Sequence, residues 1–231
     1  MIKAILLDIE GTVGDIAFVR DVLFPYARKR MAETLRTRWS DPQIAAIVAE
    51  AASAVDKPLS SSDAATDQFL AWMDEDRKIT PLKTLQGIIW RDGYASGELK
   101  AHLYPDAIEA IAIWRKNGLR LFIYSSGSIE AQKLYFAHSV AGDLTGAIED
   151  YFDTTTGPKS APGSYSKIAN AVGLPASDIL FLTDASAEAT AAKSAGMQVR
   201  RIERTRARDF TGDDDGVKLL GSFASLLTPP G

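Results

Sequence analysis

Two acidic residues, Asp8 and Glu10, directly follow a short apolar run at the start of the sequence and precede Gly11 and Thr12. One carboxylate could attack a phosphorus atom while the other moves a proton to and from the oxygens involved. A glycine at this point would let the backbone approach a phosphate closely. An acid at the end of a strand can also simply cap the next turn, so the pattern indicates catalysis without establishing it.

Three further groups of polar residues follow apolar runs or tight loops. Ser125 and Ser126 stand before a predicted helix, whose N-terminal N–H groups favour an anion. Asp184 ends another apolar run, with Glu188 one helical turn further on, and such oxygen ligands suit Mg²⁺. Lys159 lies in a Gly-Pro-Lys loop and could neutralise phosphoryl oxygens or form only a salt bridge. Together the four groups predict a magnesium-dependent phosphatase.

The apolar runs before these residues are typical of buried parallel strands. They cover residues 2–7, 119–124, 151–155, 179–182 and, more weakly, 198–202. Helical patterns separate them, from Pro105 to Asn117-Gly118 and in the stretches 129–136, 165–172 and 187–195. Strands that alternate with helices predict an α/β fold with a Rossmann-like parallel sheet. Ligands of such sheets bind at the carboxyl ends of the strands, where the polar groups stand.

The segment after the first strand breaks this alternation, because nothing in it resembles a strand. Asp41-Pro42 and Thr80-Pro81 each combine an N-cap residue with a proline at the first helical position, and apolar residues then follow at helical spacing. We therefore predict an inserted helical cap domain. The predicted boundaries are 16–103 for the cap, and 1–15 with 104–231 for the phosphatase core.

The composition is that of an ordinary globular protein, with 46% hydrophobic and 24% charged residues in a chain of 231. The absence of cysteine rules out disulfides and suits a reducing cytoplasm. Lys3 and Asp8 leave no room for the apolar core of a signal peptide. The longest stretch without Asp, Glu, Lys or Arg, residues 219–231, is too short to cross a bilayer. We expect a cytoplasmic protein without a membrane partner.

The net charge of −4 argues against a nucleic-acid partner, which usually needs a basic surface. Two basic clusters, within residues 28–38 and 200–208, are interrupted by acidic residues. We interpret the first as a solvated helix face and the second as a surface loop. The expected partner is a small-molecule phosphate substrate. The oligomeric state stays open, with a monomer as one option.

The order of these motifs resembles the haloacid dehalogenase superfamily of phosphohydrolases. The resemblance rests on Asp-x-acid-Gly-Thr, a strand-terminal Ser, a Lys and a strand-terminal Asp, and it covers residues 1–15 and 104–202. A helical cap inserted after the first motif is similar to that family as well. Most members carry aspartate as the second acid, whereas this chain has Glu10. With Glu10, the segments 8–12, 18–27, 85–90 and 124–128 look like the enolase-phosphatases of methionine salvage.

This resemblance implies an enzyme, a phosphoric monoester hydrolase with enolase activity and Mg²⁺ as cofactor. It would convert 2,3-diketo-5-methylthiopentyl-1-phosphate to the acireductone 1,2-dihydroxy-3-keto-5-methylthiopentene through an aspartyl-phosphate. The implied roles are Asp8 as nucleophile and metal ligand, Glu10 as acid/base with its main-chain carbonyl on the metal, Ser125 and Ser126 on the phosphate, Lys159 on the phosphoryl group, and Asp184 on the metal. The role of Glu188 stays open.

Three alternative functions stay open. A generic sugar-phosphate phosphatase of the same superfamily would differ only in its substrate, and the other two are a carbon–halogen hydrolase and a receiver-like signalling module. The base for enolisation is Glu10 or a residue of the cap. His102 and His138 end no predicted strand, which favours a surface or packing role for both. Trp90 and Tyr94 could contact the methylthio end of the substrate or could belong to the core of the cap.

Overall fold

The computed structural model describes residues 1–214 and 216–227, so Asp215 and the last four residues of the predicted core lie outside the described residues. The chain divides into two compact units. The core unit comprises residues 1–16 and 100–231, and the cap unit comprises residues 17–99. The sequence had placed these boundaries after residues 15 and 103.

The core unit is built on a seven-stranded sheet with the order β3-β2-β1-β4-β5-β7-β6. Its strands are β1 (Ala4–Leu7), β2 (Arg120–Tyr124), β3 (Asp150–Phe152), β4 (Ile179–Thr183), β5 (Gln198–Ile202), β6 (Thr211–Asp214) and β7 (Val217–Leu220). All neighbouring strands are parallel except β6, which runs antiparallel to β7. The mostly parallel sheet confirms the predicted fold class.

The first strand lies inside the sheet, between β2 and β4, and each of its four residues is buried. Leu7 is in register with Ile123 of β2 on one side and with Leu182 of β4 on the other. Because the three strands are parallel, the residues that follow them emerge at the same edge. The register therefore places Asp8 between the ends of β2 and β4.

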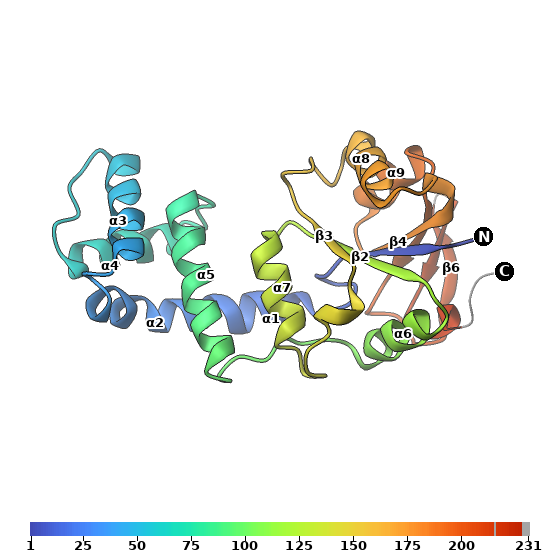
Figure 1. Cartoon of the computed structure of the whole chain (residues 1–231), viewed down its shortest axis with the longest axis horizontal. Helices are drawn as coiled ribbons and strands as arrows, with labels where there is room; N and C mark the ends of the chain where they lie inside the picture. The colour runs from blue at the N-terminus through green and yellow to red at the C-terminus, as the bar shows by residue number, and fades with distance from the viewer. Residues whose placement is uncertain (215, 228–231) are drawn as a thin grey trace. The chain divides into compact units, whose positions relative to one another are not determined.

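Helices cover both faces of this sheet (Figure 1). They are α6 (Pro105–Lys116), α7 (Ile129–Ala137), α8 (Pro162–Val172) and α9 (Ser186–Ser194), with short 3-10 turns η2 (Thr145–Ala147), η3 (Ala176–Asp178) and η4 (Ala224–Leu226). Leu6 and Phe181 share a buried apolar cluster with Ile168 of α8 and Ala192 of α9. Period-2 alternation points neighbouring strand residues such as Leu7 to the opposite face, where they are buried too.

The C-terminal part of the core unit differs from the sequence analysis in two respects. The pair of strands β6 and β7 was not predicted, and it extends the sheet beyond β5. The basic cluster 200–208 is not a surface loop throughout, because Arg200 and Arg201 lie in β5 and the side chain of Arg204 is only 12% exposed.

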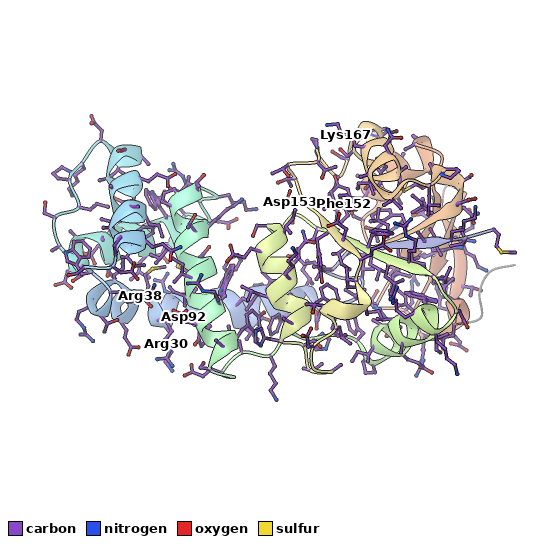
Figure 2. The ribbon with its side chains drawn as sticks, in the orientation of Figure 1. Arg30, Arg38, Asp92, Phe152, Asp153 and Lys167 are labelled. Carbon is purple, nitrogen blue, oxygen red and sulfur yellow. The ribbon has the colours of Figure 1, made fainter. Side chains whose placement is uncertain are left out.

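The cap unit consists of helices, and its described residues contain no strand. After α1 (Ile16–Phe18), which begins in the core unit, come the π-helix η1 (Val19–Leu23), α2 (Phe24–Thr37), α3 (Pro42–Val55), α4 (Ser62–Asp74) and α5 (Thr80–Ala95). Met31, Phe69 and Leu85 contribute to a buried cluster shared by the four long helices. Arg38, the C-cap of α2, pairs with Asp92 of α5 at 3.0 Å, and both are labelled in Figure 2.

The predicted helix starts in the cap unit had different outcomes. Asp41 is the N-cap of α3, and its carboxylate accepts a hydrogen bond from the N–H of Gln43 at 2.8 Å. Thr80 is not an N-cap, because α5 already begins at this residue and the N-cap is Ile79. Among the described residues, no helix combines the length and the apolar character needed to cross a membrane.

Candidate active site

A buried ion cluster lies where β1 and β4 end. The ammonium of Lys159 is 2.5 Å from Oδ1 of Asp8 and 2.8 Å from Oε2 of Glu188. The three side chains are between 7% and 17% exposed. Buried charges of this kind persist only when they are paired. Lys159 and Asp8 are thus brought together as predicted, and Glu188, whose role the sequence left open, is the second partner of the lysine.

Thr183, the last residue of β4, connects the two carboxylates from the other side. Its hydroxyl oxygen lies 2.9 Å from Oε2 of Glu188 and 3.4 Å from Oδ2 of Asp8. The same oxygen accepts a hydrogen bond from the N–H of Ala185 at 3.1 Å. Thr183 is fully buried, so these contacts are shielded from water. The sequence analysis did not single out this hydroxyl, although its position at a strand end was visible.

The loop that carries Lys159 is fixed by its main chain. The hydroxyl of Tyr165 donates to the Lys159 carbonyl at 2.7 Å, and the hydroxyl of Tyr124 donates to the Gly157 carbonyl at 2.9 Å. Ser164 donates to the carbonyl of Pro158 at 2.8 Å. Three side chains from β2 and α8 therefore hold three consecutive parts of the loop. None of them was a predicted site residue, because the partners are backbone atoms that sequence cannot assign.

The charges of this cluster do not balance. Burial raises the pKa of the Asp8 carboxyl to about 7, against the opposing effect of Lys159, and the charges of Glu188 and Asp184 raise it too. Burial and Glu188 raise the pKa of Asp184. Burial would lower the pKa of Lys159, but the two carboxylates outweigh it and the pKa is raised. Three carboxylates share one ammonium, so the site is short of positive charge.

Asp184 packs directly against the turn that follows β1. Gly11 has a φ of +68°, and a Cβ atom at this position would collide with Oδ2 of Asp184. The turn can approach the carboxylate because residue 11 is glycine. Within residues 1–214 and 216–227, no three acidic or histidine side chains form a complete metal cage. Mg²⁺ commonly takes one or two carboxylates, with waters and substrate phosphate, so the Asp8 and Asp184 pair fits this ion.

The segment after β2 has the features of an anion site. Ser125 is buried, and its Oγ accepts a hydrogen bond from the N–H of Gly127 at 3.3 Å, whereas Ser126 is exposed. Ser128 is the N-cap of α7 and accepts from the N–H of Ala131 at 3.2 Å. A hydroxyl-rich turn at the start of a helix offers N–H donors and a favourable dipole to a phosphate.

Two side chains behind this segment hold it against β3. Gln132 is 2% exposed, and its amide donates to the carbonyls of Gly127 and Phe152 at 2.8 and 2.9 Å. Asp153, which follows β3 and is labelled with Phe152 in Figure 2, accepts from the N–H of Ile129 at 3.3 Å. Neither residue was predicted, since each acts on the backbone of a neighbouring element.

Glu10 lies half-buried in the turn after β1, and its backbone bridges to Gly14. The Ile9 carbonyl accepts the N–H groups of Thr12, Val13 and Gly14 at 2.9 to 3.2 Å, which closes the turn tightly. His102 supports its end, where Nδ1 accepts from the N–H of Asp15 at 3.1 Å. This contact gives His102 a packing role.

The two aromatic candidates of the cap unit have different surroundings. The indole N–H of Trp90 donates to the Leu23 carbonyl at 2.8 Å, and its ring lies 6.0 Å from that of Phe24. Phe24 is 38% exposed, so this aromatic pair reaches the surface of the cap unit. Tyr94 is 4% exposed and belongs to the interior of the unit.

Comparisons with known proteins identify the family of this chain. The family model described as haloacid dehalogenase-like hydrolase matches residues 2–196. The Enolase-phosphatase E1 of Aquifex aeolicus is 51% identical over 99% of this chain and 97% of its own length. That of Alcanivorax borkumensis is 50% identical over 90% of this chain and 92% of its own. The crystal structure of the UTR4 protein from Saccharomyces cerevisiae has a TM-score of 0.82 and 33% identity, covering 98% of this chain and all of that one.

The resemblance seen in the sequence is therefore confirmed, from the Asp8 motif through the cap to β5. This chain belongs to the haloacid dehalogenase-like hydrolases, and within them to the family of its enolase-phosphatase E1 relatives.

Proposed function

We propose that the chain is a magnesium-dependent enolase-phosphatase of methionine salvage. Its substrate is 2,3-diketo-5-methylthiopentyl-1-phosphate, and its product is the acireductone 1,2-dihydroxy-3-keto-5-methylthiopentene. The observation that carries the proposal is the carboxylate of Asp8, held by Lys159 at the end of β1 inside the sheet. It stands in a chain that is 51% identical to an enolase-phosphatase E1 over nearly its whole length.

Phosphoryl transfer starts at Asp8. Oδ1 accepts hydrogen bonds from Lys159 at 2.5 Å and from the N–H of Ile9 at 2.8 Å, whereas within the described residues the contact of Oδ2 is the longer one with Thr183, at 3.4 Å. We assign Oδ2, the less engaged oxygen, as the nucleophile. It forms a bond to phosphorus as the bond between phosphorus and the substrate oxygen breaks, and Glu10 gives that oxygen a proton.

The second half of the reaction frees Asp8. Water attacks the phosphorus of the aspartyl-phosphate, Glu10 accepts the proton of the water, and inorganic phosphate leaves. Lys159 neutralises charge on the phosphoryl oxygens, while Ser125, Ser126 and their neighbouring N–H groups bind the phosphate. Glu188 and Thr183 keep the ammonium and the carboxylate in place.

Mg²⁺ would be held by the carboxylates of Asp8 and Asp184 and by the main-chain carbonyl of Glu10. When bound, it supplies the positive charge that the three carboxylates lack and neutralises the phosphoryl group. The support for this ion is the chemistry of the donor set and the excess of negative charge around Asp8.

Enolisation requires a base that removes a proton next to a carbonyl of the diketone. Glu10 can fill this role, since it already moves protons in the phosphatase step, and a residue of the cap unit is the alternative. His102 is the weaker candidate, because its Nδ1 is engaged by the N–H of Asp15. A cytoplasmic location and a small-molecule substrate complete the proposal.

The substrate assignment is tested by comparing kcat/KM for the diketone phosphate with that for a panel of sugar phosphates, with and without EDTA. We expect a preference for the diketone phosphate and loss of turnover in EDTA. Equal or higher kcat/KM for a sugar phosphate would identify the chain as a generic sugar-phosphate phosphatase.

The two chemical steps are separated by Glu10→Gln under single turnover. Ultraviolet absorbance follows the enol, and a phosphate assay follows hydrolysis. Loss of a proton-transfer group slows a step by about 10²–10⁴-fold, so either effect is measurable. Full enolisation by this variant would exclude Glu10 as the enolisation base and assign that step to the cap unit.

A further inference from the structure

Arg204 is a buried residue that follows β5, and it lies far from Asp8 along the sequence. Its side chain is 12% exposed, and the Asp106 carboxylate opposite it is 9% exposed. Nη1 of the guanidinium donates to both carboxylate oxygens, at 2.9 and 2.7 Å. Oδ2 of Asp106 also accepts the N–H of Phe223 at 2.8 Å. Both charged groups are therefore satisfied without water.

Two aromatic rings fix the orientation of this guanidinium. Its Cζ lies 4.1 Å from the ring centre of Tyr104 and 4.8 Å from that of Phe223. A flat guanidinium stacks well on aromatic faces, and its donors keep a rigid fork geometry. Arg204 thus has little freedom to turn, and its remaining N–H groups point in one fixed direction.

Those remaining groups bind the turn that carries Glu10. Nε donates to the Thr12 carbonyl at 3.0 Å, and Nη2 donates to the same oxygen. The neighbouring carbonyl of Val13 accepts from the N–H of Tyr104 at 2.9 Å. The carbonyl of Thr12 is therefore held by a side chain and that of Val13 by backbone, both from outside the turn.

We infer that Arg204 is a positioning residue for the reaction, acting through the turn of residues 8–15. The ion pair with Asp106 holds the guanidinium in place, and the guanidinium in turn holds the Thr12 carbonyl, two residues from the acid/base Glu10. Displacement of a reacting group by about 1 Å can cost about 100-fold in rate. The inference rests on the proposed function for the role of Glu10, but it concerns phosphoryl transfer from any substrate.

The first test is Arg204→Lys. Lysine keeps the positive charge opposite Asp106, but it cannot present two donors to the Thr12 carbonyl or stack as a plane. We expect kcat to fall by about 10- to 100-fold while KM changes by less than about threefold. The control is Arg208→Lys in the same basic cluster, because Arg208 is 67% exposed and lies 3.6 Å from Glu109. This control should keep wild-type kcat.

A second variant separates positioning from stability. The double variant Arg204→Gln/Asp106→Asn removes both buried charges together, so neither charge is left buried without its partner, which is the strongly destabilising case. Asparagine still offers an oxygen to the N–H of Phe223. We expect a melting temperature near that of the wild type and a loss of kcat similar to that of Arg204→Lys.

Amide hydrogen exchange gives a readout that a purely stabilising role would not move. Residues 9–14 should exchange faster in both variants, whereas β2 and β4 should keep their protection. Unchanged kcat per folded molecule in either variant, or faster exchange throughout the core unit without a selective effect on residues 9–14, would overturn the inference.

A further measurement compares kcat for a generic aryl phosphate with kcat for the diketone phosphate. Loss of kcat with both substrates supports positioning of the turn. If the wild type hydrolyses the aryl phosphate but not the diketone phosphate, the proposed substrate fails, while the same loss of kcat on the aryl phosphate still supports the inference. Wild-type kcat on the aryl phosphate in Arg204→Lys overturns it.

Discussion

The core unit buries two cations against carboxylates, and the two clusters differ in their balance of charge. Lys159 alone faces Asp8 and Glu188, with Asp184 close enough to raise the pKa of Asp8. Arg204 instead faces one carboxylate, and its other donors end on a backbone carbonyl. A further cation would balance the excess negative charge of the first cluster, whereas the charges of the second cluster are already balanced. The difference marks the first as the reacting centre and the second as its support.

The largest effect is expected for Asp8→Asn. The amide keeps the shape of the side chain but cannot act as the nucleophile, so turnover should fall by about 10⁴-fold or more. Circular dichroism and phosphate release under single turnover check this result. Turnover near that of the wild type, in a folded preparation free of contaminating phosphatase, would contradict the mechanism.

The same variant tests the charge imbalance through pH. The pKa of Asp8 in the folded chain, about 7, lies above the ordinary value of 3.8 for an aspartate, so the folded state binds the proton more tightly than the unfolded state. In EDTA, the free energy of unfolding of the wild type should therefore fall relative to Asp8→Asn as pH rises from about 4 to about 7. Urea titrations across this range measure the gap, and a constant gap would contradict the raised pKa.

Asp106→Asn tests the second cluster, and it should strongly lower the free energy of unfolding. It leaves the Arg204 guanidinium buried without its counter-ion, and breaking a buried pair in this way costs about 3–5 kcal/mol. Urea unfolding gives the free energy, and Glu109→Gln on the exposed face of α6 is the matched control. A loss below about 1 kcal/mol would contradict a balanced, buried pair between Arg204 and Asp106.

Asp184→Ala should weaken Mg²⁺ binding, by about 100-fold, because it removes one of two charged oxygen ligands. Isothermal titration calorimetry with MgCl₂ alone measures the affinity without any substrate. Asp213→Ala, which removes an exposed carboxylate from β6, should leave the affinity unchanged. Unchanged affinity in Asp184→Ala would place the metal elsewhere.

Thr183→Val is the smallest change in this series. It keeps the volume of a fully buried side chain but removes the hydroxyl that lies between Glu188 and Asp8. We expect a loss of about 1–3 kcal/mol in unfolding free energy, since the N–H of Ala185 loses its acceptor. A fall in kcat of about tenfold or less should accompany it. An effect as large as that of Asp8→Asn would give Thr183 a direct chemical role.

The sequence predicted those parts of the fold that depend on local patterns. The strands around Leu7, Ile123 and Leu182 each contain an unbroken run of apolar residues, because both faces of a parallel sheet are covered. The strand β6 was missed, since Thr-Gly-Asp-Asp at the edge of a sheet has no apolar pattern and only backbone pairing defines it. Thr80 was misread as an N-cap because a Thr-Pro pair fits two helix positions equally well.

The site shows the same division between local and distant information. Asp8, Lys159 and Glu188 could be selected because each stands at a strand end, in a tight loop or near the start of a helix. The sequence could not pair Arg204 with Asp106, which lies 98 positions earlier, or assign Tyr165 to a backbone carbonyl. Such contacts depend on the packing of whole elements, which no short motif encodes.

The position of β1 between two strands that come later in the sequence has a consequence for synthesis on the ribosome. This strand is made first, yet its neighbours β2 and β4 end only at Tyr124 and Thr183. The cap unit is one continuous stretch between β1 and β2, so it can complete its contacts before β1 is paired. At about 5–20 residues per second, the nascent chain carries an unpaired apolar strand for on the order of ten seconds. A chaperone that binds short apolar segments would find residues 4–7 unpaired during this time, and the nucleophile beside them is among the last groups to reach its final surroundings.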